Sequence, residues 1–139
     1  MPTTDSYDVL IIGSGEAGKY LAWTMASEGH RRAVVERKLI GGSCPNVACL
    51  PSKNIIHSAK VRSFAGRASG FGIDLQSAVT NMAGVQARKR AMVDSLRQLH
   101  LDRYRSSGAE LIMGEARFAD ERTAEVALTD GVVLRVHPS

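Results

Sequence analysis

The sequence has few cysteines, few aromatic residues and no long apolar run. Two cysteines in 139 residues cannot supply the four ligands of a structural zinc site, so we expect no metal centre. Aromatic residues make up 5% of the chain and do not alternate with the basic residues, which disfavours nucleic-acid binding. The longest apolar stretches have the length of a strand, whereas a membrane helix needs about 20 apolar residues. We therefore expect no membrane span.

The N-terminus lacks the basic and apolar regions of a secretory signal. Without that signal, two cysteines at a short spacing favour a reducing cytoplasm and a disulfide that repeatedly opens and closes. The chain does contain 44% apolar residues, enough for one soluble domain with a hydrophobic core. Its net charge is +4, and we interpret the excess of basic residues as lying on solvent-exposed helix faces.

A glycine-rich turn follows the first apolar run. Residues 7–12 indicate a buried parallel strand, and G-S-G-E-A-G at 13–18 leads into a helix predicted over 19–28. Glycines at this spacing permit a tight turn, close approach of a pyrophosphate and close packing of helix on strand. A second strand over 33–35 ends at Glu36, which is placed to accept hydrogen bonds from a ribose. The pattern predicts a dinucleotide site with contacts from Gly13, Ser14, Gly15, Glu16, Ala17, Gly18 and Glu36.

Both cysteines lie in the stretch G-G-S-C-P-N-V-A-C-L-P-S-K at 41–53. On an ideal α-helix their Cα atoms would lie roughly 8–9 Å apart, whereas a disulfide needs about 4.4–6.8 Å. Pro51 disfavours helical backbone at Leu50, which predicts an irregular turn and a new helix from Ser52 to about Arg67. A helix N-terminus and a nearby lysine would lower the pKa of either thiol. These features indicate a redox-active dithiol.

The stretch closely resembles the active-site motif of the class I pyridine nucleotide-disulfide oxidoreductases. These are the flavoproteins that include dihydrolipoamide dehydrogenase, glutathione reductase and mercuric reductase. The alanine at position 48, where glycine is usual, indicates the mercuric-reductase-like branch. The matching positions are Cys44, Asn46, Cys49, Pro51 and Lys53, and the departures from the usual residues are Ser43, Pro45 and Ala48.

The resemblance implies an α/β fold. Residues 1–139 would form the N-terminal part of a Rossmann-like, FAD-binding domain, with a parallel sheet, flanking helices and a C-terminal β-hairpin. The nicotinamide and dimerisation domains of the family would be absent, so we expect an incomplete fragment of an enzyme that is a homodimer at full length. The family's first glycine motif binds FAD, which makes FAD the expected dinucleotide.

The resemblance also implies a route for electrons. In the intact enzyme NAD(P)H reduces FAD, and the flavin reduces a Cys44–Cys49 disulfide. Cys49 would lie nearer the flavin, and Cys44 would be the interchange thiol toward a disulfide or metal-ion substrate. The further cofactor contacts that we expect are Arg37, Gly42, Ser43, Lys53, Gly114 and Ala116.

The second half of the chain predicts one long helix and three strands. A helical pattern extends from Asp74 to about Tyr104, with apolar residues spaced for one buried stripe. A strand follows over 110–118, in a segment that resembles the family's G-x-[AG]-x-F pattern. Strands over 123–128 and 132–136 flank Asp130-Gly131, which is a strong hairpin turn signal.

Two alternatives remain open. The chain could be a catalytically incomplete module that binds FAD without turnover, its dithiol inert. It could instead belong to an NAD-dependent dehydrogenase with incidental cysteines, which predicts neither flavin nor disulfide. Bound oxidised flavin is yellow, so the absorbance of the purified protein separates flavin binding from its absence. The residues that choose the substrate, and NADH or NADPH, are expected beyond Ser139.

Overall fold

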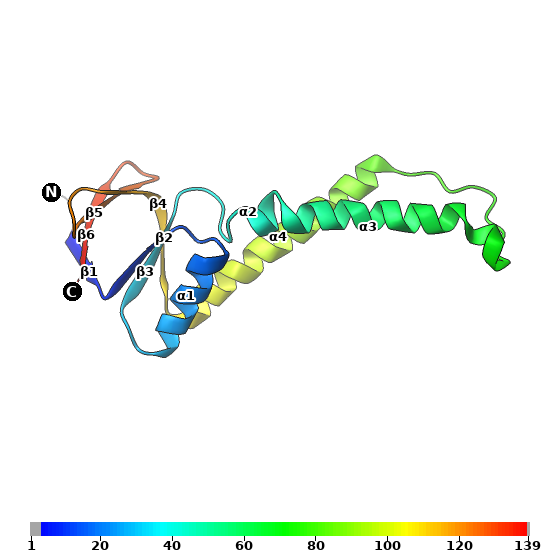
Figure 1. The fold of residues 1–139 in the computed structure, drawn as a ribbon. Coiled ribbons are helices and arrows are strands. Elements are labelled where there is room, and N and C mark those ends of the chain that lie inside the picture. The colour runs from blue at the N-terminus through cyan, green and yellow to red at the C-terminus, as the bar shows by residue number, and fades with distance from the viewer. Residues whose placement is uncertain (1–3, 139) are drawn as a thin grey trace.

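The computed structural model describes residues 4–138. A curled six-stranded sheet forms one end of the molecule, and two long helices project from it (Figure 1). The strand order is β1-β6-β5-β4-β3-β2. The strands are β1 (Thr4–Tyr7), β2 (Val9–Ile12), β3 (Arg32–Glu36), β4 (Glu110–Phe118), β5 (Ala124–Leu128) and β6 (Val133–Pro138). The helices are α1 (Glu16–Ser27), α2 (Ser43–Asn46), α3 (Cys49–Gly66), the 3₁₀ turn η1 (Ala68–Phe71) and α4 (Met82–Ser107).

The sheet combines a parallel part with an antiparallel hairpin. Strands β2, β3 and β4 are parallel, β4, β5 and β6 are antiparallel, and β1 joins β6 in parallel. The α/β class, the parallel strands with a flanking helix and the C-terminal hairpin are therefore confirmed. Strand β3 and its neighbours carry the loops of the candidate site at their carboxyl ends, where ligands bind in open parallel sheets.

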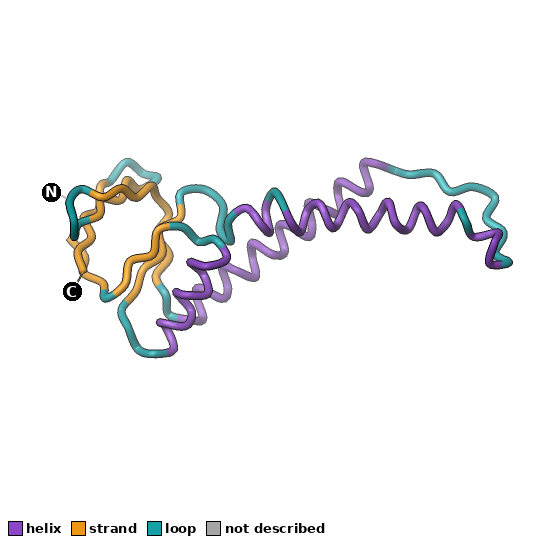
Figure 2. Tube along the Cα trace, viewed as in Figure 1, coloured by secondary structure: helices purple, strands orange, loops and turns teal. Residues whose placement is uncertain are grey.

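The first apolar run is divided into two strands, whereas the sequence predicted one over 7–12. Asp8 separates β1 from β2 and exchanges hydrogen bonds with the backbone of Arg31. Strand β1 pairs with β6 and β2 pairs with β3, so β1 and β2 lie at the two ends of the strand order although they follow each other in the chain. The sheet therefore curls back toward itself, as the strands in Figure 2 show.

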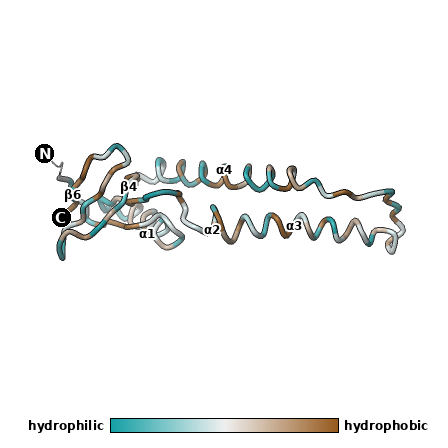
Figure 3. The backbone as a smooth tube through the Cα atoms, turned by 90° about the horizontal axis from the view of Figure 1, so that it is seen from above, coloured by the Kyte–Doolittle hydropathy of each residue, from teal (hydrophilic) through white to brown (hydrophobic). Residues whose placement is uncertain are grey.

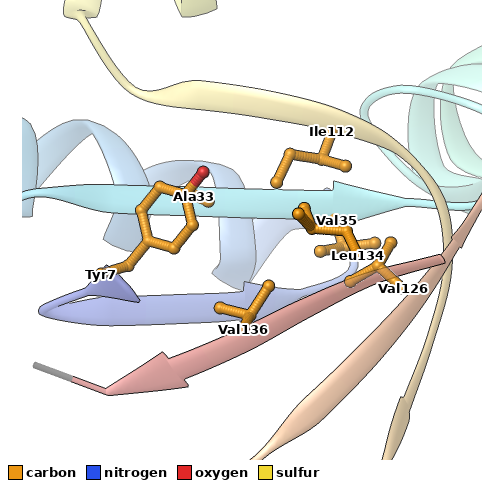
Figure 4. Packing of buried hydrophobic residues seen from close by; sticks show 7 residues of the cluster. All are labelled: Tyr7, Ala33, Val35, Ile112, Val126, Leu134 and Val136. Carbon is orange, nitrogen blue, oxygen red and sulfur yellow. The ribbon is translucent and has the colours of Figure 1, made fainter. Parts of the chain in front are cut away.

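Two apolar clusters lie on opposite faces of β3. Inside the curl, Val35 packs with residues from five other strands, among them Tyr7 and Val126 (Figure 4). On the other face, Val34 packs with Ala22 of α1 and Tyr104 of α4, and Trp23 lies against this cluster. The alternation of neighbouring valines between the two faces follows from the period-two geometry of a strand. Helix α1 and the end of α4 thus cover the outer face.

Helix α3 begins at Cys49, so the prediction of a start at Ser52 is wrong. Pro51 occupies the first turn, where backbone N–H groups have no partner within the helix and a missing one costs little. The chain breaks instead at Val47 and Ala48, whose φ/ψ angles of −135°/−19° and −116°/−93° leave the regular helix. The break therefore falls between the two cysteines and not after the second.

Helix α4 begins at Met82, and the predicted helix over 74–81 is not formed. The Asn81 side chain accepts a hydrogen bond from the Gly84 amide at 3.1 Å, which caps the helix there. The predicted buried stripe is also mostly wrong. Val93 is buried, but Met82 and Leu99 are 63% and 62% exposed.

The arm consists of α3, the connection over 67–81 and the first half of α4. It extends away from the sheet in both views, and apolar and polar residues alternate along its two helices (Figures 1 and 3). Several of its large apolar side chains are exposed, including Ile56, Phe64 and Val79. Within residues 4–138, no helix is long and apolar enough to cross a membrane.

Candidate functional site

The glycine turn between β2 and α1 has the form that the motif predicted. Gly13 has a φ of +98°, and a Cβ atom on Gly18 would lie 2.1 Å from the Gly13 carbonyl oxygen. Only glycine permits this contact of helix and turn. Helix α1 begins at Glu16, earlier than predicted, and no side chain caps its N-terminus. Its first amides are therefore available to an anionic group such as a pyrophosphate.

Glu36 connects β3 to this turn. One carboxylate oxygen accepts from the Ser14 amide at 3.0 Å and hydroxyl at 2.6 Å, and the other accepts from the amides of Lys38 and Leu39 at 2.8 and 3.1 Å. Burial raises the pKa of this carboxyl, but the hydrogen bonds from Ser14 and the two amides outweigh it, so the pKa is lowered. The ribose contact stays a prediction, and a sugar hydroxyl would have to share an oxygen that already holds the turn.

A pocket of about 360 Å³ opens beside Glu36, within the usual range for ligand sites of about 300–1,000 Å³. The pocket also contains residues that the sequence did not single out, Ile12, Val35 and Glu115. Glu115 lies between two predicted positions and pairs with Arg37 at 3.6 Å. The predicted cofactor residues that line the pocket are Gly13, Gly15, Glu36, Arg37, Gly42, Gly114 and Ala116.

The other predicted cofactor residues lie outside the lining of this pocket. Ser14 is buried behind Glu36, and Gly18 is packed against Gly13. Glu16, Ala17, Ser43 and Lys53 are exposed. Lys53 lies one turn after Cys49 in α3.

The loop between Glu36 and Asn46 contains Cys44, and we call it the cysteine loop. It lies directly against the glycine turn. Gly41 and Gly42 have φ angles of +92° and +73°, and a Cβ atom on Gly42 would lie 2.7 Å from the Gly15 Cα. The Gly41 amide donates to the Ser14 hydroxyl at 3.0 Å. Loop and turn therefore form one unit, which we call the junction (residues 13–18 and 36–46).

Asn46 holds the far side of the junction. Its amide nitrogen donates to the carbonyls of Ile40 and Gly42 at 2.9 and 2.7 Å, and its oxygen accepts from Arg97 of α4 at 2.6 Å. Asn46 is 7% exposed, so these bonds satisfy a group that would otherwise be costly to bury. This is a physical reason for an asparagine at this position of the motif.

The two cysteines lie close together in the reduced form. Cys44 is half-buried in α2, and Cys49 is the exposed first residue of α3. The hydrogen bond with Cys49 and, to a lesser extent, burial raise the pKa of the Cys44 thiol. The expected lowering is therefore wrong for Cys44, because a thiol that donates to a neighbouring sulfur retains its proton.

Sequence reasoning missed the buried Lys19. Its ammonium lies 2.7 Å from the Glu16 carboxylate and 3.1 Å from Nε2 of His100. A lysine directly after the glycine motif carries no local signal of burial, and His100 is 81 residues away in the chain. Among residues 4–138, no group of three or more histidine, cysteine, aspartate or glutamate side chains could hold a metal ion.

Known proteins are similar in sequence to this chain. A mercuric reductase of Staphylococcus aureus is 34% identical over 121 residues, which cover 86% of this chain and 22% of that protein. A dihydrolipoyl dehydrogenase of Bacillus subtilis is 41% identical over 90 residues, which cover 65% of this chain and 19% of that protein. Both relatives are thus about five times as long as the matched region.

A solved structure has the same fold. It is that of RclA from Escherichia coli, described as an HOCl-induced flavoprotein disulfide reductase in a Cu(II) complex. It matches with a TM-score of 0.80 and 28% identity, over 96% of this chain and 27% of that one. Residues 7–134 also match the family model of the pyridine nucleotide-disulphide oxidoreductases. The mixed α/β fold with its curled sheet is that of a partial FAD-binding, Rossmann-like domain, and the chain belongs to the pyridine nucleotide-disulphide oxidoreductase family.

Proposed function

We propose that this chain is the FAD-binding, dithiol-bearing part of an NAD(P)H-dependent disulfide oxidoreductase. FAD, when bound, would supply two-electron transfer between NAD(P)H and the Cys44–Cys49 disulfide. The final acceptor is a disulfide or a metal-ion substrate. The observation that carries the proposal is the contact of Gly42 with Gly15, because it places the cysteine loop directly against the predicted pyrophosphate turn.

The residues of the junction fit a dinucleotide. A Cβ atom at Gly42 would collide with the turn, and the uncapped start of α1 offers amides to the pyrophosphate. The pocket between Glu36 and Gly114 extends from that turn toward β4, where the ribose and adenine would lie. Gly13, Gly15, Arg37 and Ala116 are the further lining residues that hold the cofactor in this proposal.

The dithiol delivers the electrons by thiol–disulfide exchange. Two electrons and two protons convert the Cys44–Cys49 disulfide into two thiols. The Cys44 thiolate then attacks one sulfur of a substrate disulfide, and the other sulfur leaves and takes up a proton. Cys49 attacks the Cys44 sulfur next, which releases the second substrate thiol and restores the Cys44–Cys49 disulfide. The exposure of Cys49 and the partial exposure of Cys44 give a substrate access to the pair.

The same proposal covers the rest of the protein. The nicotinamide and dimerisation domains, and a homodimer, would come from sequence outside the 139 residues, since the matched relatives are several times longer. A cycling dithiol fits a reducing cytoplasm. The alternative is a module that binds FAD without turnover.

Titration of the purified protein with FAD tests the proposal. We expect flavin absorbance to remain with the protein after gel filtration, and a long-wavelength thiolate–flavin band to form on reduction with dithiothreitol. Cys49→Ser should abolish this band and Cys44→Ser should keep it, because Cys49 is assigned to the flavin side. Flavin that elutes free of the folded protein would refute the cofactor assignment. Bound flavin without the thiolate–flavin band would support the alternative, a module that binds FAD without turnover.

A further inference from the structure

Two separate helices carry the cysteines, and the chain between these helices is irregular. Cys44 lies in the four-residue helix α2, and Cys49 begins α3. The φ/ψ angles of Val47 and Ala48 leave the regular helix, so α3 does not continue into α2 and does not by itself set the orientation of Cys44. A helix of this length is also too short to be stable alone. The position of Cys44 is therefore fixed by contacts that α2 makes with other parts of the chain.

The Asn46 side chain joins the two ends of α2. Its amide nitrogen donates to the carbonyl oxygen of Gly42 at 2.7 Å and to that of Ile40 at 2.9 Å. Cys44 lies midway between Gly42 and Asn46, inside the segment that these bonds close. Both bonds require one orientation of the amide group, with its nitrogen toward the two carbonyls, because the amide oxygen can only accept.

Arg97 of α4 fixes that orientation. Its Nε donates to the Asn46 oxygen at 2.6 Å, although the two residues are 51 positions apart in the chain. Asn46 is buried, so without this donor its oxygen would lie in the interior without a partner. The opposite orientation of the amide would face this oxygen toward two carbonyl oxygens and its nitrogen toward an arginine that can only donate. Arg97 therefore holds the side chain that holds α2.

Helix α4 also holds α3, the helix of the second cysteine. The Asn54 side chain of α3 donates to the sulfur of Met92 at 3.3 Å, and Arg88 donates to the Ser58 hydroxyl at 2.6 Å. Helix α4 is thus attached to α3 in its first half and to α2 at Arg97. The separation of the two helices that carry the cysteines depends on both attachments.

We propose that Arg97 is a positioning residue for the dithiol. By holding the Asn46 amide, it keeps α2 at the distance from α3 at which the two cysteine sulfurs form a disulfide. A fixed α2 has less freedom to lose when the disulfide closes, so the contact favours the disulfide over the dithiol. Its purpose rests on the proposed function, in which the disulfide opens and closes in every turnover.

The test is the equilibrium of the full chain with glutathione at pH 7, with the fraction of dithiol read by alkylation and mass spectrometry. Two glutathione thiols reduce the protein disulfide to two thiols and become glutathione disulfide. Arg97→Met removes the donor, whereas Arg97→Gln keeps an N–H donor at the position of Nε, since in both glutamine and arginine a nitrogen follows Cδ. Both variants lose the charge, so their difference isolates the hydrogen bond.

We expect Arg97→Met to make the disulfide about tenfold easier to reduce, which raises its reduction potential by about 30 mV. Arg97→Gln should stay within about threefold of the parent, because it retains the hydrogen bond to Asn46. The matched control is Arg105→Met, which removes an arginine of the same helix that pairs with Asp102 at 3.1 Å. It should leave the equilibrium unchanged.

Equal shifts in Arg97→Met and Arg97→Gln would overturn the proposal, because the lost charge and not the hydrogen bond would then be responsible. An unchanged equilibrium in an Arg97→Met protein with the circular dichroism of its parent would overturn it as well. The equilibrium needs no flavin. Failure of the parent to bind FAD would therefore refute the proposed function and leave this result intact.

Should Arg97→Met fail to fold, hydrogen exchange in the parent decides. A contact that favours the disulfide is itself strengthened when the disulfide forms, because the coupling is reciprocal. The Nε proton of Arg97, followed by NMR, should exchange with solvent about tenfold more slowly in the oxidised than in the reduced protein. Equal exchange in the two forms would contradict the proposal.

Discussion

The junction and the arm share helix α3, yet they are held in different ways. At the junction, the buried side chains of Glu36 and Asn46 each make two or more hydrogen bonds to backbone groups, and the Ser14 hydroxyl donates to Glu36 and accepts from the Gly41 amide. Along the arm, the contacts join exposed side chains, as between Arg88 and Ser58 at 2.6 Å. In α3 itself the buried residue is Pro51, next to the junction. The end of α3 that carries Cys49 is thus fixed while its far end receives little support.

This difference indicates where the chain tolerates change. In the junction, Gly18, Gly41 and Gly42 have contacts that leave no space for a side chain, and a missing partner leaves a buried polar group unsatisfied. In the arm, large apolar side chains already meet solvent, so a substitution loses few contacts. We therefore expect stability to depend steeply on residues of the junction and weakly on residues of the arm.

The largest contrast is expected between two glycine-to-alanine substitutions. Gly18→Ala would place a Cβ atom 2.1 Å from the Gly13 carbonyl oxygen, whereas Gly70 has no atom within 4 Å of such a position. We expect Gly18→Ala to reduce the free energy of unfolding by about 3 kcal/mol, since backbone atoms must move apart. Gly70→Ala should stay within about 0.5 kcal/mol of the parent.

Urea denaturation of the two variants and the parent measures this contrast, and FAD titration of the folded fraction adds a second readout. Equal losses in both variants would mean that the junction is no more tightly packed than the connection of the arm.

The second contrast concerns the charge of Glu36. Glu36→Gln keeps the shape but leaves one acceptor oxygen, so the hydrogen bonds either from Ser14 or from the Lys38 and Leu39 amides are lost. Hydrogen bonds to a charged group contribute more than neutral ones, so we expect a loss of about 2 kcal/mol at pH 7. The folded pKa of Glu36 is lowered, so its contribution is fully present above about pH 4.3, the ordinary glutamate pKa, and is lost as pH falls through the folded value.

The measurement is urea denaturation of parent and Glu36→Gln at pH 7, 5 and 3.5. The difference between the two proteins should shrink at the lowest pH, because there the unfolded parent binds a proton at Glu36 more readily than the folded parent does. A difference that is constant from pH 7 to 3.5 would show that the charge of Glu36 does not organise the junction.

Much of the fold was predictable because its signals are local. The glycine motif, the strand ending at Glu36 and the hairpin at Asp130-Gly131 each lie within a few residues, and each formed where expected. The start of α3 was misplaced because Pro51 fits equally well after a helix break and in a first turn. The start of α4 was misplaced because the segment before Asn81 has helix-compatible residues and no proline or glycine between 73 and 81.

The candidate site was predictable in its residues but not in its contacts. Seven of the predicted cofactor residues line one pocket, because the motif positions them near the ends of neighbouring parallel strands. The hydrogen bonds that both carboxylate oxygens of Glu36 accept, from Ser14 and from loop amides, were not predictable. They depend on the path of the loop after β3. The Lys19–His100 contact was not predictable either, because it depends on how α4 returns across α1 after the arm.

The smallest effect is expected on the arm itself. Ile56 is 63% exposed, so Ile56→Ser removes few packing contacts and should change the free energy of unfolding by less than about 0.5 kcal/mol. The matched change in the core is Val34→Ser, since Val34 is fully buried and β-branched like isoleucine, and it should be strongly destabilising because it buries a hydroxyl and leaves a cavity. Thermal melts of both variants measure the comparison. A large loss of stability in Ile56→Ser would mean that this side of the arm is covered in solution, and sedimentation of the parent at several concentrations would then show whether a second copy of the chain covers it.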